Sequence, residues 1–197
     1  METLEYHTLD KTGWRRGPWD NEPDKVQYRD EDTGLPCLIV RGPCGALCGY
    51  VGVSPGHPWH GKDYDSCMVG EEYPDVHWGL TYAGACQHGT DPAKGICHIP
   101  GPGEPDDVWW LGFDCAHSGD LTEIKYSYGY SPIGDVYRNV TFVKSQCRKL
   151  ARQMAKIAAS GIETGTAKSE ALSAKHESPT AKPGRPEHSP QENPGEH

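Results

Sequence analysis

Short runs of apolar residues, separated by turns rich in glycine and proline, dominate the chain up to about residue 115. Runs of this length between turn residues are typical of β-strands. The pattern predicts five strands, at Lys25–Arg29, Pro36–Arg41, Ala46–Val53, Val76–Ala83 and Val108–Asp114. The last run is almost wholly apolar, which indicates a central strand that is buried on both faces.

A different spacing begins at Asn139. Apolar residues recur at helical intervals opposite a set of basic residues, and the Asn139 side chain can cap the first turn. The apolar positions are Phe142, Val143, Cys147, Leu150, Met154 and Ile157. The prediction is an α+β fold, in which one long C-terminal helix, Val140–Ala158, packs on a single antiparallel, meander-like sheet of about five strands.

The composition changes again at residue 159. Ser, Thr, Lys, Glu, Pro and His dominate from there to the end, with almost no large apolar side chain. Such a segment cannot bury enough surface to offset the entropy of the chain. We therefore predict one globular domain over residues 1–158 and a disordered tail, rich in Ser, Pro, Glu and Lys, over residues 159–197.

Charge is distributed unevenly along the 197 residues. Residues 1–140 hold 22 acidic and 10 basic side chains, a net charge of −12, whereas residues 141–158 hold five basic side chains and no acid. The acidic part repels the phosphates of nucleic acids, which disfavours nonspecific binding to duplexes. The basic residues of the helix could contact a phosphate, but a helix face exposed to solvent is the favoured interpretation.

Two features that the sequence lacks bear on the cellular compartment of the protein. No apolar run reaches the roughly 18 residues that suggest a membrane span, and the first 14 residues lack the apolar core of a signal peptide. These features predict a cytoplasmic protein, in which most of the eight cysteines are reduced thiols and a few are open to a metal-ligand role. Cys44 and Cys48 have a C-x3-C spacing, which differs from common zinc motifs.

Polar and aromatic residues gather in three segments at the ends of predicted strands: Gly56–Asp65, Val76–Tyr82 and Gly112–Asp120. Loops at strand ends display functional side chains on a rigid frame. Imidazole nitrogens and carboxylate oxygens are frequent ligands of Zn²⁺ and Mn²⁺ in hydrolytic sites. The candidate ligands of a divalent metal, Zn or Mn, are His57, His77, Asp114 and His117.

This set predicts a metal-assisted hydrolase of a phosphoester or nucleotide. A bound metal lowers the pKa of its water to about 7, and Asp63 or Asp120 would orient or deprotonate that water. Lys62 would hold an anionic group of the substrate. Taken singly, each of these residues also fits a structural role, such as Asp114 accepting backbone N–H groups in a turn.

Two other functions fit the same residues. Cys115 follows a strand, and a helix beginning there would lower its pKa, with His77 as its base. The run around Cys115 faintly resembles permuted papain-like thiol hydrolases. Alternatively, the chain is a binding module that sequesters a small ligand or a host protein in an aromatic pocket. The residues for that pocket are Trp59, Trp78, Tyr82 and Trp109.

The exact order of residues in several segments is more specific than the chemistry of their side chains. The segments GYVGVSPGHP, VHWGLTYAG and WWLGFDCAHSGD, within Trp14–Met154, resemble a family of uncharacterised proteins of tailed bacteriophages and prophages, notably those of actinobacteria. The resemblance implies a phage origin and a location in the host cytoplasm, and it implies no mechanism. The chain departs from the family at Trp78, where relatives are expected to have glycine, and a bulky ring there would narrow the pocket.

Overall fold

A computed structural model describes residues 3–87, 91–104, 106–129 and 134–173. The chain divides into two compact units, residues 1–162 and 163–197, and the described part of the second unit is helical. The elements in chain order are β1 Leu4–Tyr6, β2 Lys25–Arg29, β3 Pro36–Arg41, β4 Leu47–Val53, the 3-10 helix η1 Tyr64–Ser66, β5 Tyr82–Ala85, β6 Trp109–Asp114, β7 Asp120–Leu121, α1 Glu123–Ser127, β8 Val136–Tyr137 and α2 Val140–Ser173.

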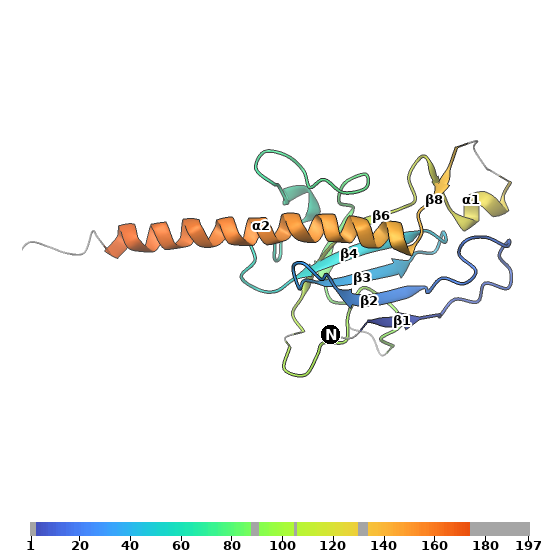
Figure 1. The fold of residues 1–197 in the computed structure, drawn as a ribbon, viewed down its shortest axis with the longest axis horizontal. Helices are drawn as coiled ribbons and strands as arrows, with labels where there is room; N and C mark the ends of the chain where they lie inside the picture. The colour runs from blue at the N-terminus through green and yellow to red at the C-terminus, as the bar shows by residue number, and fades with distance from the viewer. Residues whose placement is uncertain (1–2, 88–90, 105, 130–133, 174–197) are drawn as a thin grey trace, which may run out of the picture. The chain divides into compact units, whose positions relative to one another are not determined.

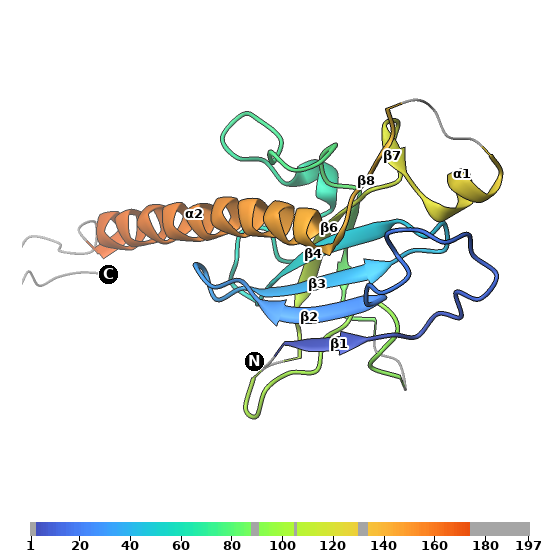
Figure 2. The ribbon, with the colours of Figure 1, turned by 45° about the vertical axis from the view of Figure 1, so that its right-hand side comes forward.

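Six strands form one sheet in the order β1-β2-β3-β4-β6-β5, and all neighbouring pairs are antiparallel. The helix α2 lies across one face of this sheet (Figure 1). A second view shows the same arrangement, with the short strands β7 and β8 and the helix α1 gathered beyond one end of the sheet (Figure 2). The predicted α+β class, a mostly antiparallel sheet with one long C-terminal helix, is confirmed.

The predicted strand at Val76–Ala83 is wrong in position, because the strand β5 covers Tyr82–Ala85. The preceding residues form a turn in which the Gly79 N–H donates to the Val76 carbonyl over 3.0 Å. Gly79 has a φ of +86°, which glycine adopts without the steric cost of a Cβ. The alternating pattern is therefore divided between a turn and a shorter strand.

The two faces of the sheet are packed against different apolar clusters. The face under α2 holds the larger core, in which sheet residues such as Val26, Ile39 and Val51 meet Val143 and Leu150 of the helix. The opposite face holds a smaller apolar cluster of Leu38, Tyr50, Val108 and Trp110. The alternation of side chains along β3 and β4 places neighbouring residues in different clusters.

Gly49 marks a close approach of α2 to the sheet. A Cβ built on Gly49 would lie 2.5 Å from the Phe113 ring and 2.8 Å from the Cys147 sulfur. Any larger side chain would push the helix away, because both neighbours are fully or almost fully buried. The glycine of this strand is therefore a packing requirement.

The helix α2 begins as the sequence predicts. The Asn139 side chain accepts a hydrogen bond from the Phe142 N–H over 2.9 Å, which satisfies one N–H of the first turn. The helix continues past Ala158 to Ser173, and residues 174–197 of the predicted tail lie outside the described residues. None of the helices in the described ranges combines the length and the apolarity that crossing a membrane requires.

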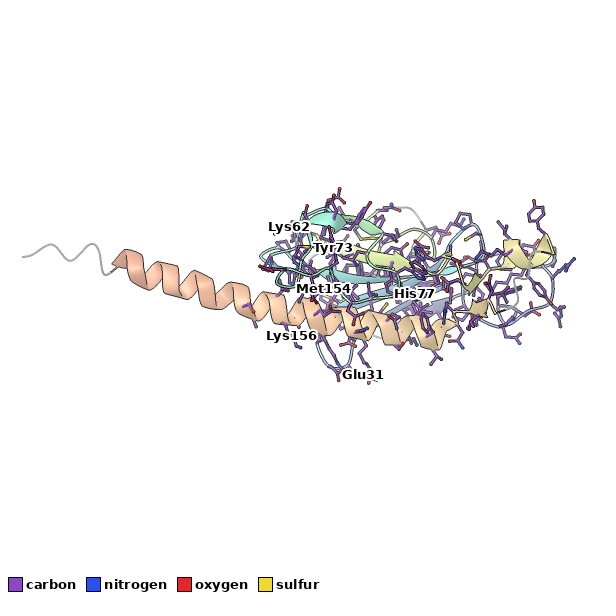
Figure 3. The ribbon with its side chains drawn as sticks, turned by 90° about the horizontal axis from the view of Figure 1, so that it is seen from above. Glu31, Lys62, Tyr73, His77, Met154 and Lys156 are labelled. Atoms are coloured by element: carbon purple, nitrogen blue, oxygen red, sulfur yellow. A yellow bond between two sulfur atoms is a disulfide. The ribbon has the colours of Figure 1, made fainter. Side chains whose placement is uncertain are left out.

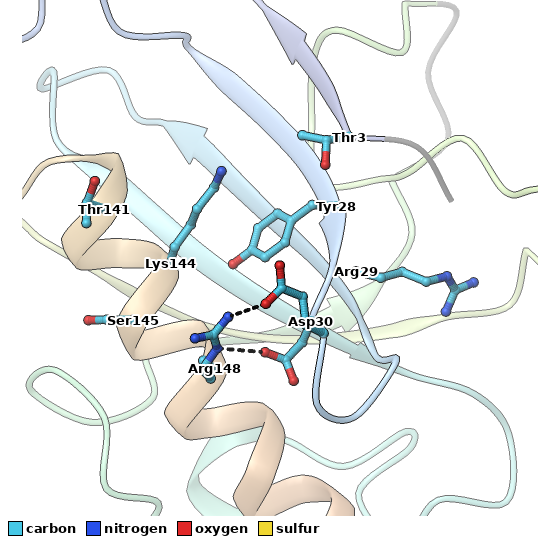
Figure 4. Close-up of a pocket in the computed structure, with 9 residues that line it drawn as sticks. Thr3, Tyr28, Arg29, Asp30, Thr141, Lys144, Ser145 and Arg148 are labelled. Atoms are coloured by element: carbon cyan, nitrogen blue, oxygen red, sulfur yellow. Dashed lines mark hydrogen bonds and ion pairs between the residues drawn. The ribbon is translucent and has the colours of Figure 1, made fainter.

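The basic side of α2 is paired with acidic side chains rather than left open. Arg148 contacts Asp30 and Glu31, and Arg152 contacts Asp32. Figure 4 shows the hollow between β2 and α2, where the Arg148 guanidinium points toward the carboxylate of Asp30. These pairs reduce the positive charge that the helix offers to a phosphate, in line with the prediction of a surface helix.

The cysteines differ from one another in state. Six are free thiols, namely Cys37, Cys44, Cys48, Cys67, Cys115 and Cys147, whereas Cys86 and Cys97 form a disulfide. Most of the eight cysteines are thus free thiols, as predicted, and the Cys86–Cys97 pair is the exception.

Candidate metal centre

The site lies in the turn that follows β6. Asp114 ends that strand, His117 lies in the turn, and Asp120 begins β7. The Asp114 carboxylate accepts the Ala116 N–H over 3.0 Å, and the Asp120 carboxylate accepts the His117 N–H over 3.1 Å. The i, i+3, i+6 spacing noted in the sequence thus becomes a tight polar turn, with Gly119 in the left-handed region at φ +85°.

His77 reaches this turn from a distant part of the chain. Its backbone N–H donates to the Gln146 side chain of α2 over 3.1 Å, and its ring packs edge-on against Phe142 at 5.2 Å. These contacts hold the imidazole so that Nε2 lies 2.9 Å from Oδ2 of Asp120. The helix therefore positions a histidine that lies 43 residues before its partner.

His77, His117 and Asp120 form a group that could hold a metal ion. Each offers one ligand atom, and these atoms lie within 4.8 Å of one another. Metal bonds of about 2.0–2.2 Å require ligand atoms no more than about 4.4 Å apart, so small rotations of the side chains are sufficient. Three protein ligands leave a coordination position open, which is the pattern of catalytic rather than structural zinc sites.

The His117 ring supports this interpretation. Its Nδ1 atom is buried and has no hydrogen-bond partner, although it lies 3.5 Å from Asp114 and 3.9 Å from Asp120. A buried polar atom without a partner costs about 1–3 kcal/mol, so such atoms are uncommon in folded proteins. A metal ion between His117 and Asp120 would satisfy this nitrogen.

Arg138 forms an ion pair with the buried carboxylate of the group. Its Nε donates to Oδ1 of Asp120 over 2.8 Å, and its guanidinium lies 4.8 Å from the centre of the Phe142 ring. Asp120 is fully buried, and the bond from Arg138 leaves Oδ2 directed at the two histidines. No local pattern points to Arg138, because its position depends on the parallel pairing of β7 with β8.

Trp78 covers the outer side of the His117 ring. The two rings are stacked, with centroids 5.3 Å apart and an angle of 11° between their planes. The Trp78 side chain is 63% exposed and its backbone has a φ of +55°, a conformation that is costly for a bulky residue. Trp78 also borders an aromatic hollow with Tyr64, Tyr73 and Leu80.

His57 does not join this group, so the predicted convergence of four ligands is wrong for it. Its Nε2 contacts the Met154 carbonyl of α2 over 3.0 Å, and its Nδ1 accepts the Trp59 N–H over 3.0 Å. Nε2 therefore attaches the 57–59 turn to the helix, and Nδ1 closes the turn itself. The structural interpretation of this histidine is the better one.

We expect His57 to make stability dependent on pH. Burial lowers the pKa of His57 below its ordinary value of 6.5, because the charged imidazolium loses its solvation in the folded chain. The unfolded chain therefore takes up a proton near pH 6.5 that the folded chain accepts only at lower pH. Stability should be constant above that pH and should fall as the pH drops below it.

Urea unfolding between pH 7.5 and pH 5 measures this effect. In His57→Asn, the amide oxygen can still accept the Trp59 N–H, and the titrating group is absent. We expect the variant to be about 1 kcal/mol less stable at pH 7.5 and to show a flatter pH profile than the wild type. Parallel profiles for the two proteins would show that His57 does not cause the dependence.

The geometry also opposes a thiol nucleophile at Cys115. The side chain is buried, and no helix begins after it, since α1 starts only at Glu123. Burial raises the pKa of the Cys115 thiol, which opposes formation of a thiolate. The predicted helix at Cys115 is wrong, because the chain turns there toward β7.

Two residues proposed to act on water and substrate lie elsewhere. Asp63 caps η1, where its carboxylate accepts the Tyr64 N–H over 2.8 Å. The Lys62 side chain is exposed beside η1 and lies apart from His77, as seen from above the helix (Figure 3). The geometry gives neither residue a contact with the group of His77, His117 and Asp120.

The four aromatic residues of the predicted pocket do not form one wall. Trp59 is buried in the core under α2, and Trp109 packs against the same core while its Nε1 donates to the Lys62 carbonyl. Tyr82 packs against the apolar cluster on the opposite face of the sheet. Only Trp78 of this set lies beside the candidate metal centre.

Comparison of the chain with protein-family models, with curated proteins and with solved structures finds no match.

Proposed function

We propose that this protein is a metal-dependent hydrolase that cleaves a phosphoester in a nucleotide-like substrate, with Zn²⁺ or Mn²⁺ held by His77, His117 and Asp120. The observation that carries the proposal is the convergence of these three donors around a buried nitrogen of His117 that has no partner. The bound ion would lower the pKa of a water molecule and polarise a phosphoryl oxygen.

Asp114 is the residue best placed to handle the proton of that water. Its carboxylate lies 3.5 Å from Nδ1 of His117 and is partly exposed, so it faces the same group from the solvent side. The structure thus favours an exchange of the predicted roles, with Asp120 as a ligand and Asp114 as the base. A positioned base contributes about 10²–10⁴-fold to a rate.

Arg138 takes the role predicted for Lys62. Its guanidinium is fixed by Asp120 through Nε and by the Phe142 ring, and about a quarter of the side chain is exposed. Guanidinium groups bind phosphate oxygens through paired hydrogen bonds. The remaining N–H groups of Arg138 would hold the anionic part of the substrate close to the metal.

Trp78 suggests a flat ring in the substrate. A bulky residue held at positive φ and exposed to solvent has a conformational cost that packing does not explain, and such strain often marks a functional position. Its indole and the adjoining aromatic hollow would stack a base, because base–aromatic stacking contributes about 1–3 kcal/mol. This feature favours a nucleotide over a simple phosphate ester.

The test measures phosphate release from nucleotides and from bis(p-nitrophenyl) phosphate with Mn²⁺ or Zn²⁺ and with a chelator. We expect turnover that requires metal and that falls by about 10²–10⁴-fold in Asp114→Asn while metal affinity is retained. Trp78→Gly should raise KM for nucleotides and should also increase the free energy of unfolding by about 1 kcal/mol, because glycine tolerates the positive φ.

The outcomes distinguish a metal-dependent hydrolase from a binding module that does not cleave its ligand. Metal-bound protein that binds nucleotides without cleaving any phosphoester would contradict the hydrolase and would leave a binding module. Turnover that is unaffected by the chelator would contradict the metal-dependent route. The phage origin and the host-cytoplasm location remain predictions from the resemblance of the sequence.

A further inference from the structure

A second group of metal-ligating side chains lies in the connection between β5 and β6. This connection, residues 86–108, contains no helix or strand in its described residues, 86–87, 91–104 and 106–108. Connections of this length without secondary structure are uncommon, and they are ordered only where other contacts hold them. The described residues show which contacts do so here.

Two buried side chains of β2 hold the backbone of this connection. Lys25 is only 1% exposed, and its Nζ donates to the carbonyls of Pro92 and Cys97 over 2.8 Å and of Gly95 over 3.0 Å. Gln27 exchanges two hydrogen bonds of 2.8 Å with the backbone of Ile99. The backbone on both sides of His98 is therefore fixed against the sheet.

The pairing of β5 with β6 brings Cys86 and Asp106, near the two ends of this connection, close together. Ala85 pairs with Trp109, so Cys86 and the residues just before Trp109 leave the sheet side by side. As a result, the Cys86 sulfur lies 3.9 Å from Oδ1 of Asp106 and 4.0 Å from Nδ1 of His98. Cys86 and His98 are both buried.

We propose that the reduced form of this protein binds a structural Zn²⁺ ion through Cys86, Cys97, His98 and Asp106. Their four ligand atoms lie within 4.8 Å of one another. Two thiolates, one imidazole and one carboxylate complete a tetrahedral site, which leaves no open position for substrate. This site therefore differs in ligand type and in number from the group of His77, His117 and Asp120.

The disulfide and the zinc site are alternative states of the same two sulfurs. A small dithiol supplies two electrons and two protons, which break the Cys86–Cys97 bond and give two thiols, and the dithiol itself becomes a cyclic disulfide. Zn²⁺ then binds both sulfurs and displaces the two thiol protons. In either state a cross-link closes the loop from Cys86 to Cys97.

The role of the ion is to keep the loop folded on the sheet where the disulfide is reduced. The loop carries few large apolar residues and covers the cluster of Leu38, Tyr50, Val108 and Trp110, with Ile96 packed against it. Loss of both cross-links would leave the hydrogen bonds of Lys25 and Gln27 and the Arg29–Glu104 ion pair to attach the loop to β2. Reduction with Zn²⁺ present should therefore preserve the fold better than reduction with a chelator present.

The experiment reduces the full chain, removes the dithiol and adds Co²⁺ as a spectroscopic substitute for Zn²⁺. We expect a thiolate-to-cobalt charge-transfer band that saturates at one equivalent of thiolate-bound Co²⁺ and disappears when Zn²⁺ is added; the group of His77, His117 and Asp120 holds no thiolate and does not contribute to this band. Cys86→Ser and Cys97→Ser should lose the charge-transfer band, whereas His77→Ala, a change in the other group, should retain it.

A second measurement covers the case in which a cysteine variant fails to fold. Wild-type protein that is reduced and loaded with Zn²⁺ should keep Cys86 and Cys97 from alkylation, and a chelator should expose both to the reagent. Wild type without a charge-transfer band, or with equal alkylation in zinc and in chelator, would overturn the proposal. Because His77→Ala removes the other group, failure of the hydrolase proposal would leave these results unchanged.

Discussion

Replacing His117 with alanine should weaken the affinity for Mn²⁺ or Zn²⁺ by at least about 100-fold. Loss of a partner that only orients a ligand already costs about 10–100-fold in metal affinity, so the loss of one of three direct ligands should cost more. Titration calorimetry on the oxidised protein measures this, because the intact Cys86–Cys97 disulfide keeps the second group from binding metal.

The same substitution should leave the fold nearly unchanged. Nδ1 of His117 has no hydrogen bond to lose, and about a quarter of the side chain is exposed, so the free energy of unfolding should change by less than about 1 kcal/mol. His60→Ala is the matched control, since its ring contacts the Asp107 carbonyl and belongs to neither metal group. Equal metal affinity in the two variants would exclude His117 as a ligand.

Replacing Arg41 with methionine should produce the largest loss of stability, about 3–5 kcal/mol. The Arg41 side chain is fully buried, and its Nε donates to the almost fully buried Asp24 over 2.9 Å. Its Nη1 donates both to the Gly45 carbonyl over 3.0 Å and to the Tyr137 hydroxyl over 2.9 Å. Methionine preserves much of the packing of the stem but leaves these acceptors without their donor.

Urea unfolding at neutral pH measures this loss, and Arg16→Met supplies the control. Arg16 pairs with Asp20, but its side chain is 95% exposed, so its removal should cost less than about 0.5 kcal/mol. A loss below about 1 kcal/mol in Arg41→Met would show that methionine replaces the buried network without penalty.

The Arg41 network also bears on the candidate metal centre. Glu22, which contacts Arg41 and the Tyr137 hydroxyl, accepts the Val140 N–H at the start of α2 over 3.0 Å. Arg138 lies between Tyr137 and Val140, so this network fixes the backbone that directs its guanidinium at Asp120. We therefore expect any Arg41→Met protein that folds to bind metal more weakly than the wild type.

Much of the fold follows from local patterns. The strands β2, β3, β4 and β6 and the start of α2 lie where the apolar periodicity predicts them, because each pattern reports which residues of one element face the core. The strand at Val76–Ala83 is misplaced because the same alternation also fits a turn at Gly79 followed by a short strand. The pairing of β7 with β8 joins two-residue segments that carry no periodic signal.

The site could be predicted only in part for the same reason. The turn of Asp114, His117 and Asp120 is local, so its spacing is visible in the sequence. The contact between His77 and Asp120 spans 43 residues and depends on how the 76–79 turn meets α2. His57 has the same residue type and an equally suitable loop, yet its Nε2 contacts the Met154 carbonyl within α2. Residue type indicates which side chains could bind a metal, whereas nonlocal packing determines which of them come together at the site.

Zinc anomalous diffraction from crystals of the oxidised protein grown with Zn²⁺ tests the metal centre most directly. The predicted result is an anomalous peak bonded to His77, His117 and Asp120 at about 2.0–2.2 Å, with no peak at the Cys86–Cys97 disulfide. An absence of zinc at this position, with Nε2 of His77 still hydrogen-bonded to Asp120, would contradict the account.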